Sequence, residues 1–432
     1  MSERLEDIAA AMVADGKGIL AADESSGTIK KRFDAIGVES TADNRRDYRE
    51  MLFRATDAMK NHISGVILYD ETIRQKAADG TPLVELIKAA GAVPGIKVDQ
   101  GAKPLAGFPG DTITEGLDGL RERLADYYQL GARFAKWGAV IDINVGAKVP
   151  SSTAIAVNCQ ALARYAALCQ EAGIVPIVEP EVLMDGDHDI DTCFEVTKAT
   201  LQQLYSELHA ARVVLEGSIL KPNMVIGGKK SGKKNSPEEV AEKTIRVFRQ
   251  TVPVAVPGIA FLSGGQSDEE ATANLNAINA IGPHPWKLTF SYGRALQAAP
   301  QKAWSGKAEN IAAGQRAFAH RARVNGLAAL GQWKADLEKA YRTYVDAYLT
   351  GDGATAYAAM SKKCQDAQPL SEFAASAEAA GELYGDIDYT IDSIVIDGDR
   401  GKVNATYPVD NLNQGGGSEW TIENGKWKMD RC

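Results

Sequence analysis

The sequence predicts an α/β protein: a (β/α)8 TIM barrel over residues 1–332, followed by a small α+β domain over residues 333–432. Two observations predict the barrel. Short apolar runs alternate with amphipathic helical stretches, which implies parallel strands, and eight such runs occur, enough to close a barrel. A third observation predicts the second domain, because residues 334–432 carry 10 Lys+Arg against 17 Asp+Glu, a more acidic balance than in the preceding residues.

The eight runs are largely apolar at first and carry polar or charged residues toward their C-terminal ends. In chain order they are GILAADES (18–25), GVILYDE (65–71), GIKVDQG (95–101), RFAKWGAVI (133–141), VPIVEPEV (175–182), VVLEGSILKPN (213–223), IAFLSGGQ (259–266) and WKLTFSYG (286–293). The parallel strands of a barrel end on one shared face, where enzymes of this architecture keep their active sites. The polar ends therefore predict a single site built from several strands.

Two lysines are expected in this site. Lys221 closes the apolar part of the sixth run, and Lys136 is expected to end the fourth strand. A lysine that is desolvated beside another cation loses much of its preference for the charged state, and the neutral amine attacks carbonyl carbons to form a Schiff base. Each lysine alone is more simply a snorkelling side chain. Together with the carboxylates that end other strands, the two favour a catalytic group.

Three carboxylates are candidates for proton transfer. Glu179 and Glu181 are two residues apart in the fifth run, so a strand places them on the same side. One carboxyl with a raised pKa would act as acid and base; a salt-bridged pair is the alternative, and for Glu181 it is nearly as well supported. Asp23 could take a proton from a substrate hydroxyl, or it could cap the next helix, a role that Ser25 or Ser26 would fill equally well.

Glycine-rich loops after the seventh and eighth runs predict phosphate binding. The loops after strands seven and eight are a frequent phosphate site in TIM barrels. Glycines let backbone N–H groups approach an anion, and an arginine adds a fork of donors; for either loop alone a tight turn is the simpler reading. The residues expected to bind substrate or its phosphates are Ser263, Gly264, Ser291, Gly293 and Arg294, with Ser25, Thr28 and Lys97 for a second phosphate.

Several classes of function gain no support. The net charge of -9 does not favour nucleic-acid binding, and no apolar stretch is long enough for a membrane span. The loop GGKKSGKKN (227–235) misses the nucleotide-binding motif, because Lys234 stands where Ser or Thr belongs. The five histidines lack metal-ligand spacing, so no metal is expected.

Cysteine usage and the N-terminus predict a cytoplasmic protein. No signal peptide is visible, and no CxxC pair occurs among the five cysteines. We expect Cys159, Cys169 and Cys193 to be buried small hydrophobes. Cys364 and Cys432 could pair, and the sequence leaves that open.

An ordered set of motifs resembles one family. GKGILAADES, SGVILYDE, GIKVDQG, FAKW, AGIVPIVEPEV, LEGSILKPNM, FLSGGQS and TFSYGRALQ, over roughly residues 5–332, resemble class I fructose-1,6-bisphosphate aldolases. The resemblance implies that Lys221 forms the Schiff base and that Glu179 moves protons around the carbinolamine. Asp23 would take the C4 hydroxyl proton, and Lys136 and Glu181 would assist electrostatically. It also implies a phosphorylated sugar substrate, no metal or other cofactor, and a homotetramer.

Two departures from the family pattern matter. Family members usually have an active-site arginine after the FAKW tryptophan, where this chain has Gly138. Many members also end in a tyrosine that aids enamine protonation, whereas this chain continues to Cys432, so another donor is expected for that step. Because of Gly138, a Schiff-base lyase that acts on a different phosphorylated sugar remains an alternative function. A binding or scaffold protein with a relict barrel is the alternative from another class.

The C-terminal segment predicts helices followed by an antiparallel sheet. LEKAYRTYVDAYL (337–349) and EFAASAEAAGELY (372–384) have helical periodicity, and three strand-like stretches follow, the last with a turn at Asn424-Gly425. The segment weakly resembles NTF2-like domains, which are cone-shaped α+β modules. We expect a structural or interaction module whose partner is unknown and whose aromatic residues form its core.

Overall fold

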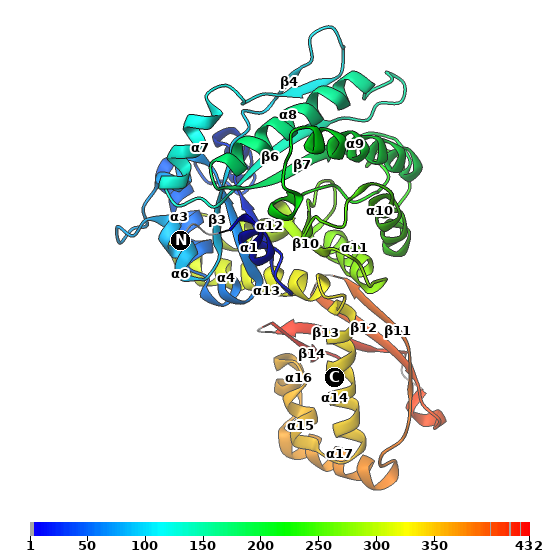
Figure 1. The fold of residues 1–432 in the computed structure, drawn as a ribbon. Coiled ribbons are helices and arrows are strands. Elements are labelled where there is room, and N and C mark those ends of the chain that lie inside the picture. Colours follow the sequence, from blue (N-terminus) through cyan, green and yellow to red (C-terminus); the bar gives the residue numbers. More distant parts are fainter. Residues whose placement is uncertain (1–3, 398, 414–415, 424) are drawn as a thin grey trace. The chain divides into compact units, whose positions relative to one another are not determined.

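The computed structural model describes residues 4–397, 399–413, 416–423 and 425–432, and the chain divides into two compact units, Met1–Gly331 and Gln332–Cys432. The first unit is a closed barrel of eight parallel strands (Figure 1), which confirms the predicted barrel. Strand β10 pairs with β1 and closes it. Around the barrel lie β1 (Gly18–Ala22), β2 (Ile63–Leu68), β3 (Val93–Lys97), β6 (Phe134–Ile141), β7 (Val175–Val182), β8 (Ile219–Leu220), β9 (Gly258–Phe261) and β10 (Lys287–Tyr292).

Helices surround these buried strands, and consecutive helices from α8 to α11 pack side by side (Figure 1). Several begin at a side chain that accepts a backbone N–H, which satisfies one of the otherwise unbonded donors of the first turn; examples are Ser25, Thr41, Ser151, Ser236 and Ser267. The helices are α1 (Leu5–Met12), α2 (Ser26–Asp34), α3 (Ala42–Phe53), α4 (Thr56–His62), α5 (Asp70–Arg74), α6 (Leu83–Ala89), α7 (Leu120–Gln129), α8 (Ser152–Glu171), α9 (Ile190–Ala210), α10 (Pro237–Thr251), α11 (Asp268–Ala280), α12 (Arg294–Trp304) and α13 (Ile311–Ala328), with short 3₁₀ helices η1 (Leu215–Gly217) and η2 (Ala308–Asn310).

The prediction of one long strand over 213–223 is wrong. Leu215–Gly217 forms η1, since the N–H groups of Gly217 and Ser218 bond locally to the carbonyls of Val214 and Leu215. Gly217 also packs so closely that a Cβ there would lie 2.8 Å from the Leu5 Cβ. Only Ile219–Leu220 remains as β8, so Lys221 follows the strand directly.

The prediction that Lys136 ends its strand is also wrong. Lys136 is the third residue of β6, which continues to Ile141 because β7 pairs with it as far as Val182. On the other side, however, β3 ends at Lys97, which pairs with Lys136. Lys136 is thus level with the end of its neighbouring strand. The sequence also gave no signal for the short hairpin of β4 (Ala102–Pro104) and β5 (Thr112–Thr114).

The second unit combines helices with a four-stranded antiparallel sheet in the order β11-β12-β13-β14. Its core contains Leu337, Tyr341, Trp420 and Trp427, all buried. The short helices α15 and α16 were not predicted. The elements are α14 (Trp333–Leu349), α15 (Gly353–Ala358), α16 (Lys362–Ala367), α17 (Leu370–Leu383), β11 (Thr390–Asp397), β12 (Arg400–Thr406), η3 (Asp410–Asn413), β13 (Ser418–Glu423) and β14 (Lys426–Met429).

The remaining sequence expectations concern particular residues. A disulfide joins Cys364 in α16 to Cys432, a pairing that the sequence left open. Cys159, Cys169 and Cys193 are buried free thiols, as expected. The turn predicted at Asn424-Gly425 involves Asn424, which lies outside the described residues. Within the described ranges, no helix has the length and apolar character required to cross a membrane.

Candidate active site

A cavity of about 600 Å³ opens where the barrel strands end. Its walls come from many separate segments of the chain, as expected of a site at the carboxyl ends of parallel strands. All of the residues predicted for the site lie in its wall. They are Asp23, Ser25, Thr28, Lys97, Lys136, Glu179, Glu181, Lys221, Ser263, Gly264, Ser291, Gly293 and Arg294.

Two lysines and two carboxylates form a chain of ion pairs in this cavity. The Nζ atom of Lys221 lies 3.0 Å from one carboxylate oxygen of Glu179, and the Nζ atom of Lys136 lies 3.1 Å from the other. Lys136 also lies 2.9 Å from Asp23. These four side chains are almost fully buried. Each charge is therefore paired, which a low-dielectric site requires.

The charges of this cluster shift the pKa values of its members. Burial opposes ionisation of Asp23, but the ammonium groups of Lys136 and Lys221 outweigh it and lower the Asp23 pKa to about 2. Burial likewise opposes the charge on Lys136, yet the carboxylates of Asp23 and Glu179 raise the Lys136 pKa well above its usual value. Asp23 is thus an ionised base beside a persistently charged Lys136.

Glu181 is a cavity carboxyl group with a raised pKa. Burial and the negative charge of Glu179 raise the Glu181 pKa to about 7, although both lysines oppose the shift. Glu179 and Glu181 are two residues apart in β7, and both line the cavity, as their spacing predicted. Glu181 exchanges its proton near neutral pH, which suits a group that holds or passes a proton.

Backbone N–H groups and small side chains offer two places for anions. Ser25 is the N-cap of α2, and its hydroxyl contacts that of Thr28 at 3.1 Å. This settles the open question of the cap, because Ser25 fills that role and Asp23 does not. Gly293 is the N-cap and Arg294 the first residue of α12, which follows β10, the strand that pairs with β1. Helix N-termini favour negative groups through their unbonded N–H donors and the helix dipole.

The set of residues predicted for the site did not include Arg32 or Asp99, although Asp99 is one of the polar residues that end the third run. Arg32 lies one helical turn after Thr28 and pairs with Glu24. Asp99 pairs with Lys97 and accepts a hydrogen bond from the backbone N–H of Gly138 at 3.2 Å. The i, i+4 spacing from Thr28 on a helix was a signal that would have found Arg32.

Gly138 lies beside Glu179, one of the candidates for proton transfer. It pairs with Glu179 between β6 and β7, and a Cβ at this position would lie 3.0 Å from a Glu179 carboxylate oxygen. The residue that departs from the family pattern therefore gives Glu179 its space. Outside the gaps in the described chain, no three His, Cys, Asp or Glu side chains come together as a metal site.

Comparison with known proteins bears on what this site does. The family described as fructose-bisphosphate aldolase class-I matches residues 4–349. A probable fructose-bisphosphate aldolase class 1 of Xanthomonas campestris pv. campestris is 58% identical over 333 residues, 77% of this chain and 99% of that protein. Fructose-bisphosphate aldolase C of Homo sapiens is 54% identical over 337 residues, 78% of this chain and 92% of that protein.

A solved structure agrees with these sequence matches. A fructose-bisphosphate aldolase from Plasmodium falciparum aligns with a TM-score of 0.74 and 48% identity, and the alignment covers 76% of this chain and 95% of that one. The family match spans well over half of the chain and includes the whole barrel. The chain therefore belongs to the class I fructose-bisphosphate aldolase family.

Proposed function

We propose that Lys221 forms a Schiff base with the C2 carbonyl of fructose 1,6-bisphosphate and that Glu179 moves the protons of that step. The observation that carries this proposal is the Glu179 carboxylate held between the amines of Lys221 and Lys136. A carboxylate in this position accepts a proton from the attacking amine and returns it to the carbinolamine hydroxyl as water leaves. The charged Lys136 assists the reaction electrostatically.

Carbon–carbon cleavage follows from the iminium that this step creates. Asp23, which is ionised, takes the C4 hydroxyl proton, the C3–C4 bond breaks, and its electron pair passes to the iminium nitrogen to give an enamine. Glyceraldehyde 3-phosphate leaves, and protonation and hydrolysis then release dihydroxyacetone phosphate from Lys221. The iminium accepts the electrons, so the mechanism needs no metal.

The two ends of the substrate occupy the two anion sites. Ser263, Gly264, Gly293 and Arg294 bind the 1-phosphate, and Ser25, Thr28 and Lys97 bind the distal phosphate. Ser291 also contacts the substrate. Support comes from the helix N-termini at α12 and α2 and from the cations beside them.

Borohydride trapping tests the covalent step. Reduction with dihydroxyacetone phosphate present should attach a stable adduct to Lys221, identified by peptide mass mapping, and Lys221→Met should carry none. Lys136→Met keeps the nucleophile, so it should still label at Lys221, more slowly. An adduct on a different lysine would refute the assignment.

Gly138 bears on which sugar is preferred, because it replaces a residue that in the family is usually an arginine. Comparing kcat/KM for fructose 1,6-bisphosphate and fructose 1-phosphate measures this preference. A large preference for the monophosphate would favour the alternative of a lyase for another phosphorylated sugar.

We further propose that the second unit is an NTF2-like, non-catalytic structural or interaction module, and that the protein is a cytoplasmic homotetramer. Support for the module comes from its helices and four-stranded antiparallel sheet. Support for the location comes from a relative in Arabidopsis thaliana named as cytosolic, 56% identical over 324 residues. Sedimentation velocity of the full chain tests the tetramer.

A further inference from the structure

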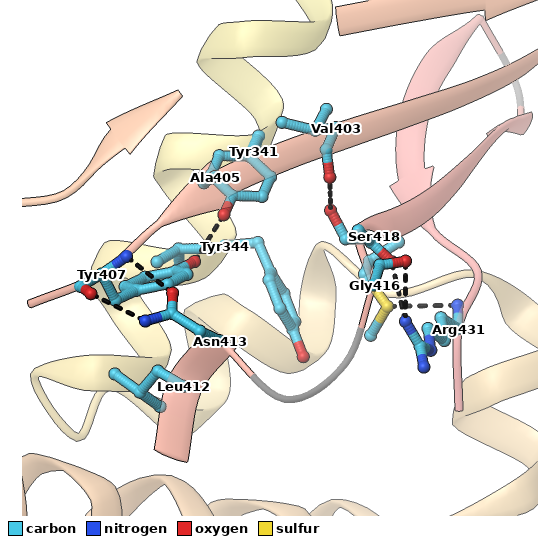
Figure 2. Close-up of a pocket in the computed structure, with 13 residues that line it drawn as sticks. Tyr341, Tyr344, Val403, Ala405, Tyr407, Leu412, Asn413, Gly416, Ser418 and Arg431 are labelled. Carbon is cyan, nitrogen blue, oxygen red and sulfur yellow. Dashed lines mark hydrogen bonds between the residues drawn. The ribbon is translucent and has the colours of Figure 1, made fainter. Parts of the chain in front are cut away.

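The second unit contains a cavity of its own, of about 260 Å³. It lies between α14 and the strands β12 to β14, and η3 and the end of the chain complete its wall (Figure 2). Pockets for drug-sized ligands are usually about 300–1,000 Å³. This cavity therefore suits a small molecule with a single ring rather than a nucleotide or a peptide.

The lining is aromatic and aliphatic, with a single charge. Three tyrosines, Tyr341, Tyr344 and Tyr407, share the wall with aliphatic residues such as Val403 and with Met429. None of the thirteen described lining residues is acidic, and Arg431 is the one that carries a charge. An apolar body with one negative group is the complement of such a lining.

The tyrosine hydroxyls differ in their bonding. Those of Tyr341 and Tyr407 hydrogen-bond to each other, and Asn413 bonds the backbone of Tyr407 from both its amide N and its amide O (Figure 2). For Tyr344, no hydrogen-bond partner of the hydroxyl occurs among the described residues, and its ring lies between the Tyr407 side and the Arg431 side of the cavity (Figure 2). Burial raises the Tyr344 pKa, so its hydroxyl remains a donor. A half-buried donor without a partner favours a ligand that supplies an acceptor.

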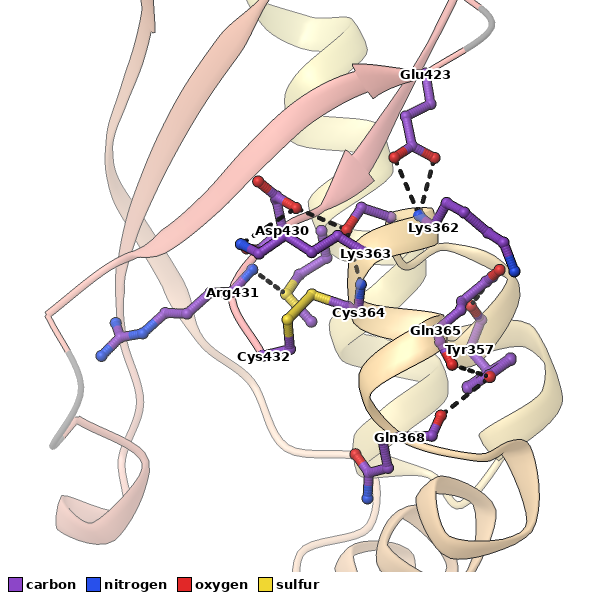
Figure 3. The surroundings of a disulfide bond; sticks show 12 residues. Tyr357, Lys362, Lys363, Cys364, Gln365, Gln368, Glu423, Asp430, Arg431 and Cys432 are labelled. Carbon is purple, nitrogen blue, oxygen red and sulfur yellow. Dashed lines mark hydrogen bonds and ion pairs between the residues drawn. A yellow bond between two sulfur atoms is a disulfide. The ribbon is translucent and has the colours of Figure 1, made fainter.

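Arg431 is fixed in place from both sides along the chain. Before it, Asp430 donates its backbone N–H to the Glu419 carbonyl at 2.8 Å and accepts a hydrogen bond from the Ser361 hydroxyl at 2.7 Å. After it, Cys432 is joined to Cys364 by the disulfide, and the Arg431 side chain extends away from this bridge (Figure 3).

The position of the Arg431 guanidinium is fixed as well. Its Nη1 atom donates to the carbonyls of Gly416 and Gly417, at 3.3 and 2.8 Å. A guanidinium held in one orientation loses little entropy when it accepts a ligand, so its charge is preorganised at the edge of the cavity.

We propose that this cavity binds a small monocyclic carboxylate, with the ring among the tyrosines and aliphatic side chains and the carboxylate facing Arg431 and the Tyr344 hydroxyl. A carboxylate matches a single planar guanidinium better than a doubly charged phosphate does, since Arg431 is the one cation among the described residues that line the cavity. The disulfide holds Arg431 at this position. The inference concerns a different unit from the barrel and stands apart from the catalytic proposal.

The test uses benzoate as the probe and benzamide as its neutral counterpart, titrated calorimetrically into the full, oxidised chain. Each titration is done both without and with inorganic phosphate, which occupies the anion sites of the barrel. We expect benzoate to bind with a dissociation constant on the order of 0.1–1 mM, as befits so small a ligand. Arg431→Gln should weaken benzoate at least about tenfold and leave benzamide unchanged. Fructose 1,6-bisphosphate cleavage should be the same in this variant and the wild type.

Matched variants make the test specific. Arg400→Gln removes an exposed arginine of β12 that does not line the cavity, so it should leave benzoate affinity unchanged. Tyr344→Phe keeps the ring and should weaken benzoate severalfold, and Cys432→Ser should do the same by freeing the chain end. No binding at about 20 mM benzoate, equal affinity in Arg431→Gln and wild type, or binding that phosphate abolishes would each overturn the site. Unchanged affinity in Cys432→Ser would overturn the role given to the disulfide.

Discussion

Gly138 shows how one missing side chain shapes the candidate active site. A Cβ at this position would lie 3.0 Å from the Glu179 carboxylate, closer than an ordinary carbon–oxygen contact. We predict that Gly138→Ala lowers kcat for fructose 1,6-bisphosphate only about threefold, because the end of the Glu179 side chain must shift by a few tenths of an ångström, while family members with an arginine here accommodate a Cβ. Steady-state kinetics checks this.

A surface glycine serves as the control for Gly138. Gly146 is exposed, and a Cβ there would make only an ordinary contact, 3.6 Å from the Asn144 side-chain oxygen, so Gly146→Ala should leave kcat unchanged. Borohydride should still label Lys221 in Gly138→Ala, since the nucleophile remains. An unchanged kcat in Gly138→Ala would show that Glu179 does not need this space.

The raised pKa of Glu181 makes stability depend on pH in a defined direction. Burial and Glu179 raise this pKa from 4.5 to about 7, so between these values the folded state keeps a proton that the unfolded state releases. The contribution of Glu181 to the free energy of unfolding is therefore highest below pH 4.5, falls as pH rises to about 7, and is level above that. The glutamine of Glu181→Gln cannot ionise. The free energy of unfolding of this variant should therefore equal that of the wild type near pH 4.5 and exceed it by up to about 3 kcal/mol near pH 8.

Urea unfolding of the barrel at several pH values measures this effect. Glu122→Gln, at an exposed position of α7, should follow the wild-type profile throughout. Parallel profiles for Glu181→Gln and wild type would mean that Glu181 does not hold its proton in the folded state.

Among the elements, α3 and α12 fix the end of β1 through buried polar groups. Arg49 of α3 reaches Glu24 at 3.2 Å and the Ala22 carbonyl at 3.3 Å, and its side chain is 2% exposed. Gln297 of α12 donates to Glu24 at 2.8 Å and to Ala21 at 2.7 Å. These contacts hold the segment that carries Asp23.

We predict that Arg49→Met destabilises the barrel by about 2–3 kcal/mol, because it removes a buried, charged hydrogen bond to Glu24, which keeps Arg32 and Gln297 as partners. Arg46→Met is the control on the same helix, and its more exposed pairs with Asp43 and Asp47 make about 1 kcal/mol or less the expected loss. Denaturant unfolding measures both. Equal losses in the two variants would mean that the buried network does not anchor β1.

The sequence predicted the barrel because each of the eight strand–helix repeats has a recognisable apolar run. It predicted the site because polar residues follow these strands in order. It failed where a local interaction overrode the pattern. Lys136 lies inside its strand because β7 extends the pairing, and η1 replaces part of a strand because Gly217 packs closely on α1.

Other residues of the site have no periodic signal. Asp99 reaches the cavity from the segment that follows β3, and its ion pair with Lys97 depends on how that segment turns back. Hairpin strands of three residues, such as β4 and β5, are too short to show alternation. The Cys364–Cys432 bond depends on a distance across 68 residues, which only the tertiary structure sets.

At the scale of the whole molecule, each unit has its own hydrophobic core. The core of the second unit is built from residues between Leu337 and Met429, and a core of the barrel is built from residues between Ile8 and Ala260. A unit that buries its own apolar side chains has its own cooperative unfolding reaction. We predict that calorimetry of the full chain resolves two transitions.

Ligand and disulfide assign these transitions. A hexitol 1,6-bisphosphate resembles the substrate but lacks the carbonyl. It should raise the midpoint temperature of the barrel transition only, since it binds only the folded barrel. Cys364→Ser should lower the free energy of unfolding of the second unit only, by about 2–4 kcal/mol, because the disulfide restricts the unfolded chain over a separation of 68 residues. Reducing agent should bring wild type to the level of Cys364→Ser. A single transition that moves under both perturbations would mean that the two cores unfold as one.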